Sequence, residues 1–201
     1  MNRNRRLLLK RLFATLSLLL GSASYAAGAP PAKPADTAPL TATAVFAGGC
    51  FWGVDAVFKH VKGVSDVVSG YAGGSAATAT YEQVSRGGTG HAEAVRVRFN
   101  PAQVSYRQLL QVFFRVAHDP TQLDRQGPDV GSQYRSGIWT ASEEQRREAE
   151  AYVKELQASG RFGTRRIVTR IEPAKTFWPA EDYHQDYIAA TGRACHVTNP
   201  W

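Results

Sequence analysis

A cysteine beside two aromatic residues is the first feature of this sequence that could do chemistry. The stretch GGCFWG, residues 48–53, places Cys50 between a glycine pair and the side chains of Phe51 and Trp52. If Cys50 begins a helix, unpaired N–H groups and the helix dipole stabilise its thiolate and lower the pKa of the thiol. The glycines leave the sulfur open to approach, and aromatic faces favour an apolar or partly positive group. Taken alone, the same residues are also compatible with ordinary core packing beside a helix start.

Cys195 is the second of two cysteines and lies 145 positions after Cys50. An exported domain permits disulfides. In the chain-entropy model, closing so long a loop contributes roughly 4–5 kcal/mol. From the residues alone, one structural bridge is therefore a serious interpretation.

The first 40 residues indicate export followed by a linker. Residues 1–26 combine a basic start, an apolar stretch around residues 12–20 and small residues suited to cleavage after Ala26, as in a signal peptide. The apolar stretch is shorter than the ~20 residues that span a bilayer, and the paired arginines also resemble a twin-arginine signal. Residues 27–40 are rich in Ala and Pro and predict a flexible linker. We therefore expect a periplasmic or otherwise exported protein whose catalytic domain spans residues 41–201.

The formal net charge of +7 does not by itself indicate nucleic-acid binding. Five of the 24 Lys and Arg residues lie in the predicted leader, and without them 19 basic residues face 17 acidic ones. Phosphate binding needs clustered charge, whereas adjacent basic residues beyond the leader occur only as Arg146-Arg147 and Arg165-Arg166. With 43% hydrophobic residues, we expect a globular domain that is a monomer in solution and has no nucleic-acid partner.

Hydrophobic periodicity predicts strands and helices in mixed order. Strands are predicted within residues 42–47, 63–74, 92–99, 136–141 and 165–174, and helices within residues 50–61, 100–118, 142–158 and 179–191. The second helix should turn Leu109, Val112, Phe113 and Val116 inward. Residues 119–135 form a long polar loop, of a kind that is often functional. Because no strict βαβ rhythm is visible, we predict an α/β fold of the α+β two-layer sandwich type, with helices covering a mixed sheet and a coil-rich C-terminal tail.

Five segments resemble, in the same order, motifs of the peptide methionine sulfoxide reductase A family. They are GCFWG (49–53), GYAGG (70–74), TYEQVSRGGTGHAEAVRVRF (80–99), HDPTQLDRQGPDVGSQYRSGIW (118–139) and PAEDYHQDY (179–187). Several long motifs in register are far more specific than one pentapeptide. The resemblance implies reduction of the S-epimer of methionine sulfoxide, free or within proteins.

The resemblance assigns the nucleophile and the acid. Cys50 would attack the sulfoxide sulfur, and Glu93 would protonate the oxygen, which is otherwise a poor leaving group. To act near neutral pH, Glu93 needs a raised pKa, most simply through burial among aromatics. Glu93 shares its strand parity with the apolar Val95 and Val97, although an exposed strand glutamate is the alternative from the sequence.

The resemblance also implies the substrate contacts. Tyr81 and Tyr134 match tyrosines whose hydroxyls hold the sulfoxide oxygen, a task suited to a neutral donor on an apolar ring. Asp129 matches an aspartate that helps to bind substrate through polar contacts. Phe51 and Trp52 match the hydrophobic pocket for the ε-methyl group. By pattern alone, the tyrosines would be half-buried packing residues and Asp129 a turn residue.

A catalytic use of Cys195 follows from the resemblance as well. Once methionine leaves, Cys50 is a sulfenic acid, which condenses with a nearby thiol, and Cys195 is the candidate resolving cysteine. A thioredoxin-like dithiol would then reduce the disulfide. The expected partners are this reductant and oxidised methionine-containing proteins, with no bound cofactor and no metal. The tail departs from the family, since ATGRAC stands where many members have NPxGYC, which bears on the resolving rate.

Three alternatives compete with this interpretation. A Cys–His hydrolase would pair a histidine with Cys50 and have no use for Cys195; its candidate bases are His60, His91, His118, His184 and His196. A metal site could draw on Glu181, Asp182, His184 and Asp186, but these residues lack a recognised ligand spacing and could instead form a solvated helix face with a structural His184. A disulfide-stapled binding domain would keep its bridge under mild reductant.

Overall fold

The fold is that of a computed structural model, which describes residues 41–193. The predicted signal peptide, the linker at residues 27–40 and Cys195 lie outside the described residues. Within residues 41–193, no helix is long and apolar enough to cross a membrane.

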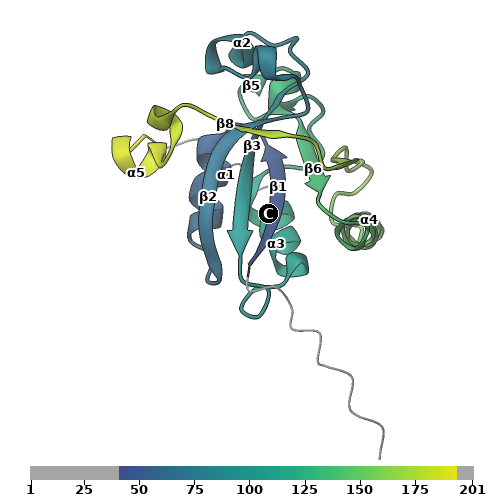
Figure 1. Ribbon diagram of the computed structural model, residues 1–201. Coiled ribbons are helices and arrows are strands. Elements are labelled where there is room, and N and C mark those ends of the chain that lie inside the picture. Colours follow the sequence, from purple (N-terminus) through teal and green to yellow (C-terminus); the bar gives the residue numbers. More distant parts are fainter. Residues whose placement is uncertain (1–40, 194–201) are drawn as a thin grey trace, which may run out of the picture. The chain divides into compact units, whose positions relative to one another are not determined.

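A mixed six-stranded sheet forms the framework of the domain (Figure 1), in the order β7-β6-β1-β3-β2-β8. Its strands are β1 (Ala42–Gly48), β2 (Val64–Ala72), β3 (Ala92–Phe99), β6 (Ser136–Thr140), β7 (Arg170–Pro173) and β8 (Phe177–Pro179). Neighbouring strands are antiparallel except β6 and β7, which run parallel. Two short strands, β4 (Arg125–Gln126) and β5 (Asp129–Val130), pair separately.

Helices pack on the sheet to give the second layer. Figure 1 shows α1 (Phe51–Lys59) and α3 (Tyr106–Val112) together behind the strands, and α4 (Glu143–Ala158) packs against β6 and β7. The shorter elements are α2 (Tyr81–Ser85), α5 (Tyr187–Thr191), the π-helical η2 (Phe113–Ala117), and the 3-10 turns η1 (Ala76–Thr78), η3 (Ser132–Tyr134) and η4 (Asp182–His184). The predicted α+β sandwich, with helices covering a mixed sheet, is confirmed.

Alternation along the strands decides which face of the sheet is buried. On β3, Val95 and Val97 join the main core, whereas Arg96 and Arg98 point to the other face. The core centres on Phe46 of β1, whose ring stacks on rings from α1 and η2. These partners are Phe58, at a centroid distance of 5.0 Å, and Phe113, at 4.9 Å. The opposite face carries a smaller apolar cluster of Ala47, Ala72, Ala92, Ala94 and Trp139.

Strand direction brings the predicted site residues to one edge of the sheet. Because β1 and β2 both run antiparallel to β3, the ends of β1 and β2 lie beside the start of β3. Tyr71 of β2 therefore pairs with Glu93 of β3. Ser136, the first residue of β6, pairs with Gly48 at the end of β1, so the loop at residues 119–135 arrives at this same edge.

The predicted helix over residues 179–191 is wrong, because tertiary hydrogen bonds divide it. β8 ends at Pro179, and only η4 and α5 are helical beyond it. Between them, Gln185 is extended, and its amide bonds both the N–H and the C=O of Ser69, at 2.9 and 3.0 Å. Asp186 then takes a left-handed conformation with φ 54°. A side-chain amide thus pairs with β2 like a further strand, which a continuous helix could not allow.

The inward orientation predicted for Val116 is also wrong. Residues 113–117 form a π-helical turn, whose extra residue shifts the phase of the helix. Val116 is therefore 42% exposed, whereas Ala117 is buried. The strand predicted at residues 165–174 is shorter than expected, since only Arg170–Pro173 pair with β6.

Candidate active site

Cys50 occupies the N-cap of α1, directly before the first helical residue, Phe51. The preceding Gly49 has φ 90°, and a Cβ there would lie 2.5 Å from Cβ of Gln126. Glycine is therefore required both for the backbone angle and for the close approach of the loop at residues 119–135. The sharp turn places Cys50 at the N-terminus of α1, where the helix dipole favours negative charge.

Glu93 reaches the same helix terminus from the sheet. Its Oε2 accepts a 3.0 Å hydrogen bond from the backbone N–H of Phe51. The residue is 2% exposed, on the face predicted from its shared parity with Val95. Burial of a carboxyl disfavours its charged form, while the amide donor favours it. The exposed-glutamate alternative is therefore excluded.

One cavity of about 130 Å³ brings together every predicted site residue that the structure describes. Its lining residues are Cys50, Phe51, Trp52, Tyr81, Glu93, Asp129 and Tyr134. They come from α1, the start of α2, β3, β5 and η3, so five separate elements build the site. Cys195 is the predicted site residue that lies outside the described part of the chain.

The two tyrosines in the cavity are neutral hydrogen-bond donors at any ordinary pH. Burial raises the pKa of Tyr81, and negative charge on Glu93 or Cys50, when either group is ionised, adds to the effect. Burial likewise raises the pKa of Tyr134, with further contributions from Glu93 and Asp129. Both phenols thus keep their protons, as donors to an oxygen must.

Trp52 is held by partners that the sequence analysis did not assign. Its indole Nε1 donates to Nδ1 of His184 at 3.1 Å, and its ring stacks on Tyr187 at a centroid distance of 3.7 Å. His184 is buried, and burial lowers the pKa of its imidazole despite the charge of Glu181. A neutral imidazole can accept the indole hydrogen bond, so His184 orients one side of the apolar pocket.

Glu181 was considered above as a metal ligand, but it bridges two other elements. Its Oε2 accepts from the hydroxyl of Tyr71 at 2.8 Å, and its Oε1 accepts from the backbone N–H of Tyr81 at 3.0 Å. The start of α2 is thereby tied to β2. Among residues 41–193, no group of three or more His, Cys, Asp and Glu side chains is arranged to hold a metal ion.

The model of the family described as peptide methionine sulfoxide reductase matches residues 42–200. The chain belongs to this family. It is 55% identical over 151 residues to "Peptide methionine sulfoxide reductase MsrA 2" of Mesorhizobium japonicum, covering 75% of this chain and 77% of that protein. It is 52% identical over 157 residues to the MsrA of Acidobacterium capsulatum, covering 78% of this chain and 99% of that protein.

Solved structures of the family have the same fold. Mxr1 from Saccharomyces cerevisiae in reduced form has a TM-score of 0.73 at 35% identity, covering 79% of this chain and 90% of that one. Mxr1 in complex with Trx2 has a TM-score of 0.52 at 30% identity, covering 73% and 84%. The predicted family is thus confirmed, and this peptide methionine sulfoxide reductase is a peptide-methionine (S)-S-oxide reductase.

The histidines of the reductase are engaged elsewhere, which weighs against a Cys–His hydrolase. His118 is fully buried between the carbonyl of Phe113 and the hydroxyl of Ser136, and burial lowers its pKa to about 4. His91 accepts from the N–H of Gly74 and contacts the carbonyl of Ser75. His60 contacts a carbonyl of its own helix, and His196 lies outside the described residues.

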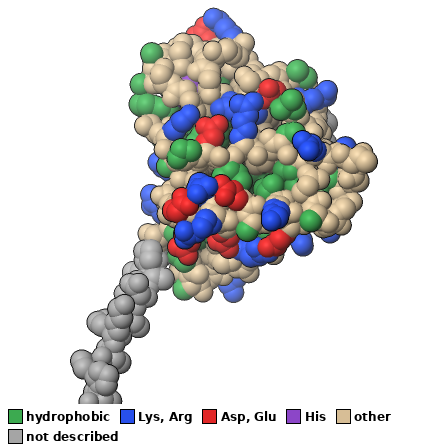
Figure 2. All heavy atoms as spheres, turned by 90° about the vertical axis from the view of Figure 1, so that its right-hand side faces the viewer, with side chains coloured by type: hydrophobic (Ala, Val, Ile, Leu, Met, Phe, Trp, Pro, Cys, Tyr) green, Lys and Arg blue, Asp and Glu red, His purple; other side chains and the backbone are tan. Residues whose placement is uncertain are grey.

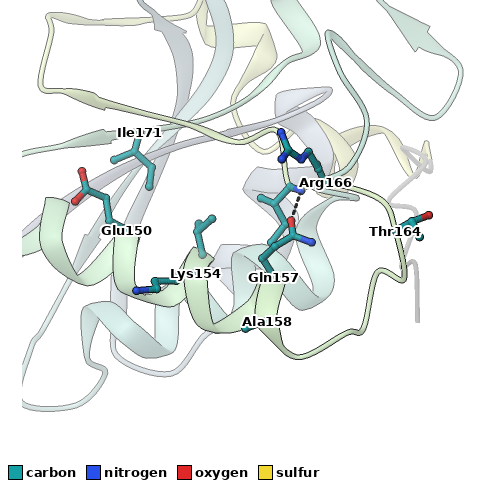
Figure 3. Close-up of a pocket in the computed structure, with 9 residues that line it drawn as sticks. Glu150, Lys154, Gln157, Ala158, Thr164, Arg166 and Ile171 are labelled. Atoms are coloured by element: carbon teal, nitrogen blue, oxygen red, sulfur yellow. Dashed lines mark hydrogen bonds between the residues drawn. The ribbon is translucent and has the colours of Figure 1, made fainter.

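A larger groove of about 740 Å³ lies away from this chemistry, between α4 and residues 164–171 (Figure 3). Gln157 spans part of it by accepting from the N–H of Ile167 and donating to the carbonyl of Arg165. The residues that line this groove include neither a cysteine nor a tyrosine. On the face drawn in Figure 2, basic and acidic side chains are interspersed. On α4, Arg146 pairs with both Glu143 and Glu150. The smaller cavity, by contrast, is lined by the thiol of Cys50, the carboxyl of Glu93 and two phenols.

Proposed function

We propose that Cys50 is the nucleophile that removes oxygen from methionine sulfoxide. The thiolate attacks the sulfoxide sulfur, and the oxygen ends on the cysteine as a sulfenic acid while methionine leaves. The substrate sulfur gains two electrons and the cysteine sulfur loses two, so the step needs no bound cofactor. The observation that carries the proposal is the position of Cys50 at the N-cap of α1, in one cavity with Glu93.

Glu93 supplies the proton that the sulfoxide oxygen needs. Burial of its side chain favours the neutral carboxyl, which is the form able to donate. Because Oε2 accepts from Phe51, we place the proton on Oε1. The hydroxyls of Tyr81 and Tyr134 would hold the same oxygen, and their raised pKa values keep them protonated while they do so.

The remaining cavity residues would select the substrate. Phe51 and Trp52 line the apolar side, where the ε-methyl group fits. Asp129 lies on β5, five positions before Tyr134 in the same motif, and would bind polar groups of the substrate backbone. The S-epimer is preferred if its oxygen faces the hydroxyls while its methyl group faces the indole.

Cys195 would resolve the sulfenic acid to a disulfide, which a thioredoxin-like dithiol protein then reduces. The neighbouring structure of Mxr1 with Trx2 supports a partner of this class. Oxidised methionine-containing proteins are the expected substrates. We further propose export from the cytoplasm on the pattern of residues 1–26, which sequencing the N-terminus of the mature protein would test. An N-terminus at residue 1 would contradict cleavage after Ala26.

A single-turnover experiment without reductant tests the mechanism. Wild-type protein should release one methionine per chain and lose two thiols. Cys195→Ser should also release one methionine but form no intramolecular disulfide, and Cys50→Ser should release none. Methionine formation by Cys50→Ser would refute the nucleophile, and steady turnover of Cys195→Ser with a dithiol protein at the wild-type rate would refute the resolving role. The S- and R-epimers, assayed separately, test the stereochemistry.

A further inference from the structure

A charged cluster ties the last described segment to the helix that begins at Cys50. Lys59, the last residue of α1, has its Nζ 3.0 Å from Oδ2 of Asp55 and 2.6 Å from Oδ1 of Asp186. Asp186 is the N-cap of α5. We propose that Lys59 is a positioning residue for disulfide formation, because it holds the segment leading to Cys195 against the helix that presents Cys50. This inference rests on the resolving role proposed above for Cys195.

Burial alone does not hold α5 in place. The helix has five residues, none of them buried, and so short a helix is not stable by itself. It packs against α1, where Tyr187 stacks on Trp52 with an interplanar angle of 10°. The pair of Lys59 with Asp186 is the charged contact between the same two helices. The ring stack and the ion pair are therefore two contacts that attach α5 and its N-cap to α1.

Solvent-exposed ion pairs usually contribute little, but Lys59 is fixed from the buried side. Its side chain is 27% exposed and that of Asp55 is 5% exposed. Burial raises the pKa of Asp55 to about 6, and the hydrogen bond and charge of Lys59 oppose that shift. The ammonium group is thus already placed by Asp55 when it meets Asp186, whose side chain is 63% exposed. A pre-positioned cation loses less conformational entropy when it forms the outer pair.

The backbone at Asp186 also needs an anchor. With φ 54° it is left-handed, a conformation that few residues other than glycine adopt, although aspartate tolerates it better than most. This residue redirects the chain from η4 into α5. The contact of its carboxylate with Lys59 compensates for that backbone strain and selects the direction in which α5 leaves.

That direction matters for the resolving reaction. The Cys195 thiol attacks the sulfur of the Cys50 sulfenic acid, an S–S bond forms, the S–O bond breaks, and the hydroxyl leaves with the thiol proton as water. The rate follows the effective concentration of one sulfur at the other, which falls as the tether becomes longer and looser. Cys195 follows Asp186 by nine positions. Releasing α5 increases the number of residues between Cys195 and the nearest fixed position of the chain, and should slow this step more than methionine release.

The test separates methionine release from disulfide formation. Lys59→Met, Lys59→Arg and Asp186→Asn are compared in rapid-quench single turnovers, counting methionine and remaining thiols. Lys62→Met is the matched control, because Lys62 is an exposed lysine just beyond α1. We expect Lys59→Met to release methionine at the wild-type rate but to lose its second thiol roughly tenfold more slowly. Lys59→Arg should restore most of the rate, and Lys62→Met should match wild type.

A double variant distinguishes positioning from a general loss of structure. Asp186→Asn should slow thiol loss as Lys59→Met does, and combining the two should add little, since both remove one interaction. The proposal is overturned if Lys59→Met forms the disulfide at the wild-type rate, or if methionine release slows equally. If Cys195 is not the resolving cysteine, Cys195→Ser will turn over normally with the dithiol protein. This result is distinguishable from the two outcomes above.

Discussion

The backbone N–H of Phe51 donates a 3.0 Å hydrogen bond to Oε2 of Glu93. The donor is the first residue of α1 and the acceptor lies near the start of β3. The contact therefore sets the distance between the proposed proton donor and Cys50 through backbone atoms. Such a link is more rigid than one made by two long side chains, and it ties the acid to the nucleophile whenever α1 and β3 are packed together.

Glu93→Gln should keep this contact and lose the chemistry. The glutamine carbonyl can still accept from Phe51, so we expect a folded protein with wild-type thermal stability. Without an acidic proton, single-turnover methionine formation should fall by roughly 10²–10⁴-fold. Glu82→Gln, at an exposed position on α2, is the control. A Glu93→Gln rate within twofold of wild type, on the order of error in such comparisons, would assign proton donation to another group.

Gly49→Ala should destabilise the protein more than the same substitution at Gly160, a second glycine with a positive φ. The new Cβ would lie 2.5 Å from Gln126, whereas a Cβ at Gly160, with φ 72°, meets nothing within 4 Å. Gly160→Ala should cost about 1–2 kcal/mol from the backbone alone. Gly49→Ala should add an overpacking cost of about 1–3 kcal/mol. Urea unfolding measures both, and equal costs would contradict the close approach of the loop at residues 119–135.

Tyr71→Phe should weaken the attachment of α2 to the sheet. Glu181 loses the hydroxyl donor at Oε2 and keeps only the N–H of Tyr81 at Oε1. Leaving a partly buried carboxylate short of a donor should lower the free energy of unfolding by about 1–3 kcal/mol. Tyr183→Phe is the control, because Tyr183 is exposed. It should change the free energy of unfolding by less than about 0.5 kcal/mol. Equal losses in both variants would refute the bridging role of Glu181.

Two buried groups, Asp55 and His118, should have opposite effects on how the free energy of unfolding depends on pH. The pKa of Asp55 is raised to about 6 by burial, with Lys59 opposing the shift and the charges of Asp186 and Asp66 adding to it. A carboxyl with a raised pKa binds its proton more tightly in the folded state, so acidification through pH 6 stabilises the fold. The pKa of His118 is lowered by burial to about 4. Its unfolded form takes up a proton first, so acidification below about pH 6.5 destabilises the fold.

In Asp55→Asn, the acid destabilisation caused by His118 should therefore appear without the opposing contribution of Asp55. Between about pH 6.5 and pH 4.5, its free energy of unfolding should fall with acid more steeply than that of wild type, by up to about 1.4 kcal/mol per pH unit. Denaturant titrations across this range measure the difference. Asp182→Asn, at an exposed position in η4, is the control, with a slope expected to match wild type. Parallel curves for Asp55→Asn and wild type would contradict the raised pKa of Asp55.

Local pattern predicted much of the framework. The run from Ala42 and the break at the glycine pair predicted a strand followed by a helix that starts at Cys50, and the structure has both. The alternation Glu93, Val95, Val97 predicted the face on which Glu93 is buried. These features depend on periodicity over a few residues, so neighbours in the sequence are enough to specify them.

Polar residues near the C-terminus show where this approach fails. Glu181 and Gln185 lie in a stretch with a helix-like pattern, yet their partners are on β2 and α2, between 100 and 116 positions earlier. Gln126 was likewise not recognised as a support, and the partner of a structural His184 was not predicted. Their proximity to Gly49 and Trp52 exists only after the sheet has formed. No periodicity signals such bonds.

The sequence by itself determined the family, the place of Cys50 at a helix start and the buried side of β3, since motif order and short-range alternation are written directly in the chain. Only the tertiary structure decided that Asp129 and Tyr134 reach the cavity of Cys50 and Glu93, and that Lys59 pairs with Asp186. Those relationships depend on strand order and on loops that close over long separations. Their geometry is a property of the folded domain, because only packing brings such distant side chains within hydrogen-bonding distance.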